Sequence, residues 1–589
     1  MNNSNNIVQK RYDEIRKMWK LKVRIFTILA ALAAIVHLSN CSFPPHNSAG
    51  VNSSDGLTAE TAPLKLPEGF RAIVVADSIG KARHLAVNGN GDIYVKLGSL
   101  KDGKGIIYLQ DTDGDGKADK RTGFGDYEGT GIYIRENYLY ASSNEGVYRY
   151  QLNSEGKVAE TESPEIIVKG LIDRRQHNSK SITLDHAGNI YVNIGAYSNA
   201  CQILDRTEGS LGRNPCPVLD SAAGIWQFKA DKQNQNYKEG IKYATGLRNV
   251  VGLDWNEELN QLFVMQHGRD QLFQLYPKIY SAAQGAELPA ETMYALKKGD
   301  NCGWPYVYYD HLQKKKILAP EYGGDAVKTG GEKAIDPVVA FPGHLAPNGL
   351  LFYKGKMFPE RYKNGAFIAF HGSWNRAPEK QMGYFVAFVP FRDGRPSGNW
   401  EIFANNFAGT DSVVSPGDAK HRPCGLAEGP DGSLYVSDDS RGTIYRILYT
   451  GAKKNEDASP VSKNSEEISN NISSMSVSAQ RGKTIYTQYC LSCHQVDGSG
   501  VSQLNPPLKK SPYVMGQGSK LASIVMNGYN AGVEINGETY TNPMPSFGVL
   551  LKDEEIADVL NYIRNSFDNN ADEVSVKLVS DSRKKPGDK

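Results

Sequence analysis

The sequence predicts an all-β six-bladed propeller followed by a small all-α domain, and three features support this. Short segments with alternating apolar residues recur after Gly or Asn turns, as strands do. Residues 452–477 are polar and nearly free of large apolar groups, so they cannot bury a core and are predicted to be a linker. Residues 553–563 place acids in a first turn and apolar residues at helical spacing behind them, which predicts a helix.

The repeated segment is a turn followed by a short strand that contains Tyr or Phe. It occurs at residues 91–95, 137–140, 188–192, 261–264, 365–368 and 432–436. Such units, repeated along the chain, predict the blades of a propeller. Their spacing is uneven, so long loops are expected, above all between residues 270 and 350. A large β-sandwich is the alternative interpretation.

Residues 1–41 are predicted to be a targeting segment. Basic residues precede an apolar run, 25–38, that is short for a membrane span, and the run leads into Cys41. The ending Leu38-Ser39-Asn40-Cys41 resembles a lipobox, in which cleavage leaves a lipidated cysteine. An uncleaved anchor is the alternative. Both interpretations place the remaining chain outside the cytoplasm, as a membrane-anchored protein facing the periplasm or the cell surface.

Composition divides the rest of the chain. Residues 42–58 are rich in Ser, Asn, Gly and Pro, which predicts a tether to the membrane. We then expect the propeller over 59–450, the linker over 451–477, the helical domain over 478–567 and a charged tail over 568–589. The net charge is +2, so composition gives no reason to expect a nucleic-acid partner.

Residues 490–494 read Cys490-Leu491-Ser492-Cys493-His494, the attachment pattern for haem c. Two thiols with two residues between them can add to the vinyl groups of haem, and His494 can then bind the iron. A zinc pair or a thioredoxin-like redox pair would be the alternatives. His494 is the only histidine after residue 421, so zinc would lack further histidine ligands nearby.

Met544 is predicted to be the second iron ligand. Residues 542–548 resemble the methionine loop of class I cytochromes c, and a methionine ligand raises the reduction potential. Met515 and Met526 are the alternatives, although methionine also fills cores. Residues 506–508 resemble the segment whose backbone carbonyl orients the histidine ligand.

Export also changes how the remaining cysteines are interpreted, because an oxidising compartment tolerates disulfides. Cys201 and Cys216 are close in sequence, so we expect them to pair. A disulfide between Cys302 and Cys424 then follows by elimination, since lipid and haem account for the other three cysteines.

Six ordered segments resemble the glucose/sorbosone dehydrogenase family over about residues 65–450. They are residues 177–181, 246–249, 266–270, 301–305, 371–376 and 422–425. Residues 198–201 and 212–217 are more similar to the sorbosone or pyranose dehydrogenase branch. The resemblance implies a six-bladed propeller that oxidises a sugar with pyrroloquinoline quinone (PQQ).

The resemblance assigns catalytic roles that suit the chemistry. His177 matches the family's base, and a neutral imidazole can take the proton of a sugar hydroxyl. Arg248 and Asn249 match the pair that contacts the quinone oxygens and stabilises charge there. This chain has Ala196 where the soluble glucose dehydrogenases carry an acid that supports the base. His177 must therefore be oriented in another way.

Cofactor-binding roles follow from the same resemblance. PQQ carries three carboxylates, for which Arg376 and Arg422 are the candidates, with Trp374 as a stacking surface. Arg83 is a further candidate. The backbone carbonyls of Gly268 and Arg269 match positions that bind the catalytic Ca²⁺, which prefers oxygen ligands.

A separate acidic loop resembles the start of an EF-hand. Asp111, Asp113, Asp115 and Asp119 place carboxylates around a Gly turn, although the distal Glu of an EF-hand is absent. A structural calcium site is the prediction, and a solvated hairpin turn is the alternative.

Together these patterns indicate an exported quinohaemoprotein that oxidises a sugar or a related alcohol. Its electrons would pass from PQQ to haem c and then to a downstream acceptor. A propeller that binds carbohydrate or a partner without turnover, beside an independent cytochrome, is the alternative. A calcium-dependent propeller hydrolase is a third interpretation, which the six matching segments disfavour.

Overall fold

The structure is a computed structural model of the chain. It describes residues 57–410, 412–451, 477–495, 497–500, 505–529, 532–535, 537–540, 544, 546–548 and 551–583. The predicted targeting segment with Cys41, most of the tether and residues 452–476 lie outside these ranges. Within them, no helix is long and apolar enough to cross a membrane.

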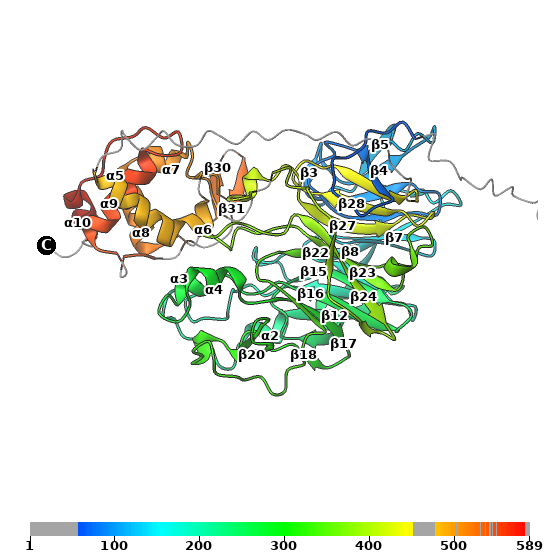
Figure 1. Ribbon diagram of the computed structural model, residues 1–589, viewed down its shortest axis with the longest axis horizontal. Coiled ribbons are helices and arrows are strands. Elements are labelled where there is room, and N and C mark those ends of the chain that lie inside the picture. Colours follow the sequence, from blue (N-terminus) through cyan, green and yellow to red (C-terminus); the bar gives the residue numbers. More distant parts are fainter. Residues whose placement is uncertain are drawn as a thin grey trace, which may run out of the picture. The chain divides into compact units, whose positions relative to one another are not determined.

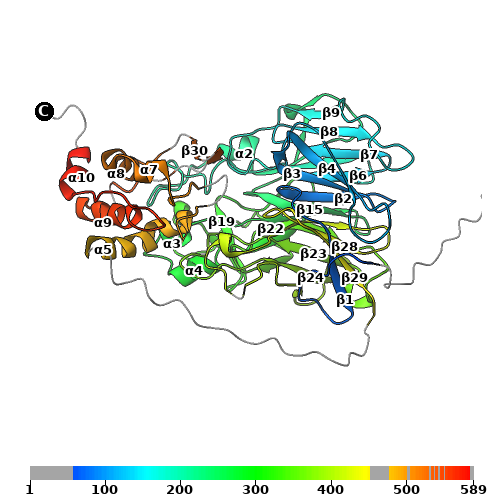
Figure 2. The same ribbon diagram turned by 90° about the horizontal axis from the view of Figure 1, so that it is seen from above.

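Six sheets of four or five strands form a β-propeller (Figures 1 and 2). The first three blades, in chain order, contain β2 (Ala82–Val87), β3 (Ile93–Lys101), β4 (Lys104–Gln110) and β5 (Lys120–Phe124); β6 (Ile132–Arg135), β7 (Tyr138–Ser142), β8 (Gly146–Gln151), β9 (Glu165–Lys169) and β13 (Gln235–Asn236); and β10 (Ile182–Leu184), β11 (Asn189–Ile194), β12 (Gly224–Lys229), β14 (Ile241–Thr245) and β18 (Asp300–Asn301).

The last three blades contain β15 (Val250–Asn256), β16 (Gln261–Gln266), β17 (Glu291–Leu296) and β21 (Val339–Phe341); β22 (Pro347–Phe352), β23 (Gly365–Phe370), β24 (Phe385–Arg392), β25 (Arg395–Pro396) and β26 (Glu401–Ala404); and β27 (Pro423–Glu428), β28 (Leu434–Asp438), β29 (Ile444–Tyr449) and β1 (Phe70–Ala76). The innermost strands β2, β6, β10, β15, β22 and β27 contact one another in a closed ring. The predicted six-bladed propeller is therefore confirmed.

The sequence pattern marked the second strand of every blade. The six predicted segments correspond to β3, β7, β11, β16, β23 and β28. These strands lie inside their sheets, and β23 is buried along its whole length. Their apolar residues pack against neighbouring blades, which explains why they carry the clearest signal.

The first strand of the propeller closes the ring. β1 pairs with β29, so the last blade combines strands from both ends of the propeller. Phe70 on β1 packs edge-on against Phe358 and Phe403, with ring centroids 4.8 and 5.0 Å apart. Phe70 is partly buried, so it contributes less than the roughly 2 to 3 kcal/mol of a fully buried aromatic side chain. Closure thus combines main-chain hydrogen bonds with an aromatic cluster.

The expected long loops contain short elements of their own. Helix α2 (Val218–Ser221) lies between β11 and β12, while α3 (Leu272–Leu275) and α4 (Ala282–Glu287) follow β16. The hairpin β19 (Val307–Asp310) and β20 (Lys315–Leu318) comes later in the chain, and it packs with the helical segment through a cluster that includes Leu272, Tyr280 and Ile317.

The C-terminal domain is mainly helical. Its helices are α5 (Val477–Ile485), α6 (Leu491–His494), α7 (Pro512–Met515), α8 (Gly518–Asn527), α9 (Asp553–Arg564) and α10 (Val576–Arg583), with a small hairpin, β30 (Val533–Ile535) and β31 (Glu538–Tyr540). Helix α5 crosses α9 at Gly482, where a Cβ atom would collide with the carbonyl of Asp558. The prediction of a tail from residue 568 is wrong in part, because α10 buries Val579 completely.

Candidate active site and haem pocket

An apolar cavity in the helical domain brings the predicted haem residues together. Cys490, Cys493, His494 and Met544 line it, with apolar side chains that include Leu521, Val525, Ile535, Val559 and Ile563. Cys490 ends a π-helical turn, Tyr486–Cys490, and Cys493 lies in α6, which follows that turn directly. Haem is largely apolar, so the donors and the lining both fit it. Of the three candidate methionines, Met544 alone lines the cavity; Met526 is buried in the core and Met515 is 41% exposed.

His494 is held by the carbonyl that the sequence pattern predicted. Its Nδ1 lies 2.9 Å from the backbone oxygen of Pro506. That hydrogen bond makes Nδ1 the donor and leaves Nε2 available as an iron ligand. Burial lowers the pKa of His494, and the bond to Pro506 opposes this effect only in part. The imidazole is therefore neutral at pH 7, as a metal ligand must be.

The predicted site residues of the propeller come together at one end of the ring. The second strand of an antiparallel blade ends where the innermost strand begins, so loops at these two points share an edge. His177 precedes β10, Arg248 and Asn249 precede β15, Gly268 and Arg269 follow β16, residues 371–376 follow β23, and Arg422 precedes β27.

The carboxylate of Asp270 joins two buried arginines. Its Oδ2 lies 2.5 Å from Arg248 Nη2 and 2.8 Å from Arg206 Nη2, and its Oδ1 accepts a hydrogen bond from Asn375 Nδ2 at 2.7 Å. Burial alone would raise the pKa of Asp270, but Arg248 and Arg206 outweigh burial and hold it well below its usual range. Sequence motifs assigned no role to Asp270, Arg206 or Asn375. An acid directly after the predicted calcium-binding pair is the one available signal.

His177 is oriented by a backbone carbonyl. Its Nδ1 lies 2.5 Å from the oxygen of Ala196, so the main chain takes the place of the supporting acid found in the soluble glucose dehydrogenases. Nε2 is then the basic nitrogen. Burial, and next the charge of Arg248, holds the pKa of His177 well below 6.5. The imidazole is neutral at pH 7 and can accept a proton.

Gly195 allows the base and the predicted quinone contacts to lie together. A Cβ atom at Gly195 would lie 2.6 Å from His177 Cβ and 2.9 Å from Asn249 Oδ1. The next residue, Ala196, donates its N–H to the carbonyl of Arg248 at 2.7 Å. The structure thus brings His177, Arg248 and Asn249 into one cluster around Gly195 and Ala196.

A second charged cluster surrounds Asp439. Its Oδ2 lies 2.7 Å from Arg83 Nη1 and its Oδ1 lies 2.6 Å from His371 Nε2. Arg422 Nη2 donates to the carbonyl of Gly372 at 2.6 Å. Burial would raise the pKa of Asp439, but His371 and Arg83 lower it far below its usual range. Asp439 is therefore an anion that fixes Arg83 and His371.

Arg376 makes most of its contacts with the propeller itself. Its guanidinium donates to the carbonyls of Ala286 and Gly343 at 2.7 and 2.9 Å and pairs with Glu287 at 2.5 Å. With the Nε bond to Lys380, four of its five N–H groups are used inside the propeller. These contacts tie the loop to α4, and a role of Arg376 in holding a carboxylate of the cofactor stays a prediction. Trp374 is 6% exposed, and its stacking role stays a prediction.

The two clusters fit an anionic, oxygen-rich cofactor. In the first, Arg248 and Arg206 share the carboxylate of Asp270; in the second, Arg83 pairs with Asp439 while the guanidinium of Arg422 donates to the Gly372 carbonyl. In the described part of the chain, Arg248 Nε and Asn375 Oδ1 are buried without a hydrogen-bond partner. Burying such groups costs free energy unless a ligand satisfies them. Burial also raises the pKa of nearby Glu291 to about 7, which makes it a weak counter-charge.

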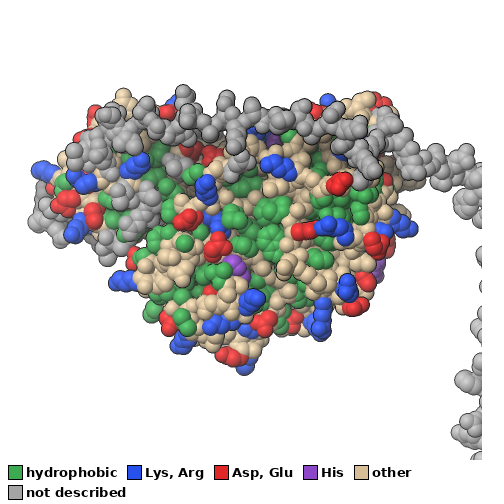
Figure 3. Space-filling view, viewed as in Figure 1, with side chains coloured by type: hydrophobic (Ala, Val, Ile, Leu, Met, Phe, Trp, Pro, Cys, Tyr) green, Lys and Arg blue, Asp and Glu red, His purple; other side chains and the backbone are tan. Residues whose placement is uncertain are grey.

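The cationic character is local to these loops. On the face that Figure 3 shows, Lys and Arg are interspersed with Asp and Glu over the described surface. The net charge of +2 agrees with this mixture. Recognition of an anionic cofactor would therefore depend on the buried arginines rather than on the field of this face.

At the predicted catalytic calcium position, the carbonyl of Gly268 already accepts a hydrogen bond in this structure. Gly268 O accepts from Arg248 Nη1 at 2.9 Å, and the Arg269 side chain pairs with buried Glu321. A calcium ion at the Gly268 carbonyl would require that guanidinium to move, because two cations repel. Calcium binding by Gly268 and Arg269 thus stays a prediction.

The acidic loop gathers three of its four predicted ligands. One carboxylate oxygen from each of Asp111, Asp113 and Asp115 lies within 4.8 Å of the others. The carboxylate of Asp119 instead accepts hydrogen bonds from Thr112 N at 2.7 Å and Thr112 Oγ1 at 2.8 Å. The three-residue group is compatible with Ca²⁺, and its occupancy stays a prediction.

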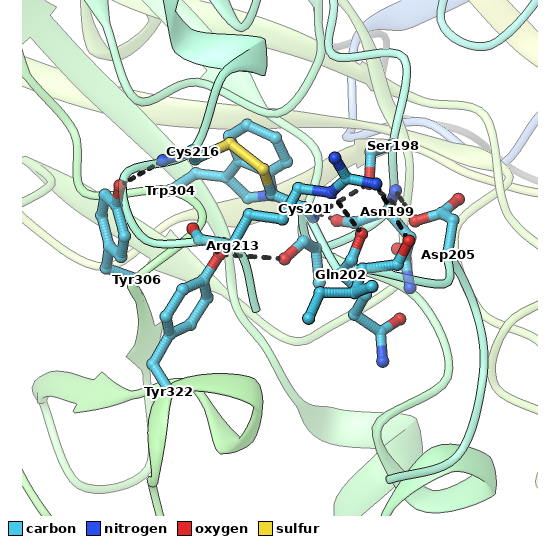
Figure 4. Close-up of a disulfide and its surroundings, with 12 residues drawn as sticks. Ser198, Asn199, Cys201, Gln202, Asp205, Arg213, Cys216, Trp304, Tyr306 and Tyr322 are labelled. Atoms are coloured by element: carbon cyan, nitrogen blue, oxygen red, sulfur yellow. Dashed lines mark hydrogen bonds between the residues drawn. A yellow bond between two sulfur atoms is a disulfide. The ribbon is translucent and has the colours of Figure 1, made fainter. Parts of the chain in front are cut away.

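The structure contains the predicted disulfide between Cys201 and Cys216 (Figure 4). The predicted pairing of Cys302 with Cys424 is wrong, because both cysteines are buried and free. Cys302 follows β18 at the outer edge of one blade, whereas Cys424 lies in β27, the innermost strand of another. The prediction, made by eliminating the other cysteines, therefore paired two thiols that belong to different blades.

Comparison with known families covers both domains. The family model described as TrAA12-like matches residues 64–450. The chain belongs to the TrAA12-like family. A second model, for cytochrome c, matches residues 479–567. This TrAA12-like chain is therefore a propeller of that family joined to a cytochrome c domain.

Relatives of the TrAA12-like chain match different shares of its length. An uncharacterized protein of Borreliella burgdorferi is 27% identical and the match covers 67% of this chain and 94% of that protein. A pyrroloquinoline quinone-dependent pyranose dehydrogenase of Coprinopsis cinerea is 25% identical over 41% of this chain and 36% of its own length. The gluconate 2-dehydrogenase cytochrome c subunit of Pantoea cypripedii is 37% identical, and the match covers 18% of this chain and 24% of that subunit. The chain thus spans about a third and a quarter of these last two relatives.

Solved structures share the propeller fold. The holo PQQ domain of the Coprinopsis cinerea pyranose dehydrogenase has a TM-score of 0.52 and 19% identity, and the match covers 67% of this chain and 99% of that domain. A calcium structure of the Trichoderma reesei family AA12 enzyme has a TM-score of 0.54 and 18% identity with the same coverage. At these identities the likeness concerns the fold.

Proposed function

We propose that this TrAA12-like chain oxidises a sugar or a related alcohol with PQQ and passes the electrons to its own haem c. The observation that carries the proposal is the cluster of His177, Arg248 and Asn249 around Gly195. It combines an oriented, neutral base with two donors beside it. The cytochrome c domain supplies the electron exit, and a downstream acceptor completes the reaction.

His177 is the proton acceptor. Nδ1 is fixed on the Ala196 carbonyl, so Nε2 takes the proton of the substrate hydroxyl as the hydride leaves the same carbon. When bound, PQQ supplies the electrophilic carbonyl that accepts this hydride. Burial, and next the charge of Arg248, lowers the pKa of His177 and keeps it unprotonated at neutral pH before substrate binds.

Arg248 and Asn249 stabilise negative charge that develops beside the base. Both side chains are buried, at 3% and 7% exposure, so their hydrogen bonds act in a medium of low dielectric. Arg422 and Arg83 would hold carboxylates of the cofactor, since guanidinium groups bind carboxylates with directed hydrogen bonds. Gly268 and Arg269 would contribute carbonyl oxygens to Ca²⁺.

The cytochrome residues prepare haem for electron transfer. Cys490 and Cys493 would attach it covalently, and His494 and Met544 would be its iron ligands. The linker predicted over residues 451–477 would keep the haem at a high effective concentration near the propeller. We also propose, from the N-terminal sequence alone, that the chain is exported and anchored through lipid on Cys41.

The test uses the purified full-length protein with its haem attached. PQQ and Ca²⁺ are added, followed by a panel of sugars, and the reduced haem band is recorded. Haem reduction that requires both PQQ and one of the sugars is the expected result. The His177→Ala variant should retain PQQ and lose reduction. Binding of PQQ without haem reduction by any sugar would instead support a binding propeller beside an independent cytochrome.

A further inference from the structure

A disulfide-closed loop reaches into the cluster around Asp270. Cys201 and Cys216, 15 positions apart, close the loop in the connection from β11 to β12 (Figure 4). Just before this loop, Ser198 Oγ and Asn199 N donate to Oδ1 of Asp205, a residue inside the loop, at 2.6 and 3.0 Å. These contacts fix the backbone just before Arg206.

Arg206 is the residue that this loop delivers to the interior. Gln202 Oε1 accepts from its backbone N–H at 2.9 Å, and the whole residue is only 4% exposed. Its Nη1 donates to Gln271 Oε1 at 2.8 Å, while Nη2 contacts Asp270 Oδ2 at 2.8 Å. A buried arginine with two directed contacts has one defined position.

We propose that Arg206 is a positioning residue for Arg248, held in place by the Cys201–Cys216 loop. The inference rests on the proposed function, which assigns Arg248 to the quinone. Both arginines donate to the same oxygen, Oδ2 of Asp270, at 2.8 Å from Arg206 and 2.5 Å from Arg248. Arg206 therefore shares the carboxylate on which Arg248 depends.

The shared carboxylate lets Arg248 engage a ligand. When Arg248 turns from Asp270 towards an anionic cofactor, Arg206 and Asn375 continue to satisfy the carboxylate. Without Arg206, the same movement would leave a buried carboxylate with no guanidinium partner, which is strongly unfavourable. Arg248 would then stay on Asp270 and on the carbonyl of Gly268, where it already donates at 2.9 Å.

The primary test is the affinity of the full-length, haem-loaded protein for PQQ, measured by equilibrium dialysis without sugar. Arg206→Met should weaken binding by about tenfold or more, and Arg206→Lys should restore part of the loss, because it keeps the charge. The matched control is Arg213→Met. Arg213 lies in the same loop but is exposed, and its guanidinium bonds only the carbonyls of Gln202 and Ile203 among the described residues.

A second measurement separates positioning from folding. For Arg206→Met, kcat should fall with a small change in the KM for sugar, while the melting temperature of the PQQ-free protein stays within a few degrees of wild type. The Cys201→Ser/Cys216→Ser variant, which lacks the disulfide, should also bind PQQ more weakly than wild type. Wild-type PQQ affinity and kcat in Arg206→Met would overturn the proposal, as would an equal loss in Arg213→Met.

The failure of each proposal has its own signature. If wild type binds PQQ but no sugar reduces the haem, the proposed oxidation is wrong, and the affinities of the variants still decide the role of Arg206. If wild type is active and Arg206→Met is indistinguishable from it, only the positioning role is wrong. If wild type does not bind PQQ, both proposals are overturned.

Discussion

A single methyl group at Gly195 should separate the base from its neighbours. In Gly195→Ala, the new Cβ would lie 2.6 Å from His177 Cβ and 2.9 Å from Asn249 Oδ1. Apolar contacts prefer about 3.5 to 4.0 Å, so His177 must move by about 1 Å. A displacement of about 1 Å can cost about 10²-fold in rate, whereas overpacking costs about 1 to 3 kcal/mol of stability. We therefore expect a folded protein with about 1% of the wild-type rate.

The assay is the rate of sugar-dependent haem reduction in protein saturated with PQQ and Ca²⁺, with thermal melting measured in parallel. Gly89→Ala is the matched control, because Gly89 lies in an exposed turn and a Cβ there meets nothing within 4 Å. This control should retain the wild-type rate and stability. Gly195→Ala with a rate within twofold of wild type would show that the spacing of His177 and Asn249 does not matter, and would refute the reasoning.

Three further predictions concern the pKa of His177, the iron ligand Met544 and the two free cysteines. The pKa of His177 is held well below 6.5, and the neutral imidazole is the base. The rate of haem reduction should therefore stay flat as pH falls from about 8 to 6.5 and decline only below that. A decline with its midpoint at or above pH 6.5 would contradict this expectation. Met544→Ala should abolish the sulfur-to-iron charge-transfer band and lower the haem potential, and an unchanged band would rule out this ligand. Alkylation of denatured, unreduced protein followed by mass spectrometry should label Cys302 and Cys424, and an unlabelled pair would restore the disulfide between them.

The parts of the site that the sequence predicted best are those fixed by local chemistry. Haem attachment constrains Cys490, Cys493 and His494 within five residues, and Pro506 lies only 12 positions from the histidine that it orients. The six blades were visible for a related reason, since each second strand is buried between neighbours and keeps its apolar pattern along the chain.

The parts that sequence could not predict depend on contacts between distant loops. Arg206 and Asp270 are 64 positions apart and meet because two adjacent blades place their loops at one end. Arg376 stands in a matching motif, yet carbonyls and a carboxylate near α4 use its N–H groups. Cys302 and Cys424 were paired by counting, which carries no information on distance.

The Ala196 substitution shows how the two kinds of information combine. The sequence indicated that His177 lacks its supporting acid, and the structure shows that a main-chain carbonyl at the same position provides the hydrogen bond instead. A backbone acceptor orients the imidazole without adding a negative charge, so the pKa of His177 is not raised by a neighbouring carboxylate at that position.

The central claim is that electrons from a sugar reach the haem within one chain. Rapid mixing of PQQ-loaded, oxidised protein with sugar under anaerobic conditions tests it most directly, with the reduced haem band as the signal. We expect a first-order rise that needs PQQ and whose rate does not change with protein concentration, because the PQQ site and the haem belong to one chain. Haem that stays oxidised while sugar is consumed, or reduction at the same rate without PQQ, would contradict it.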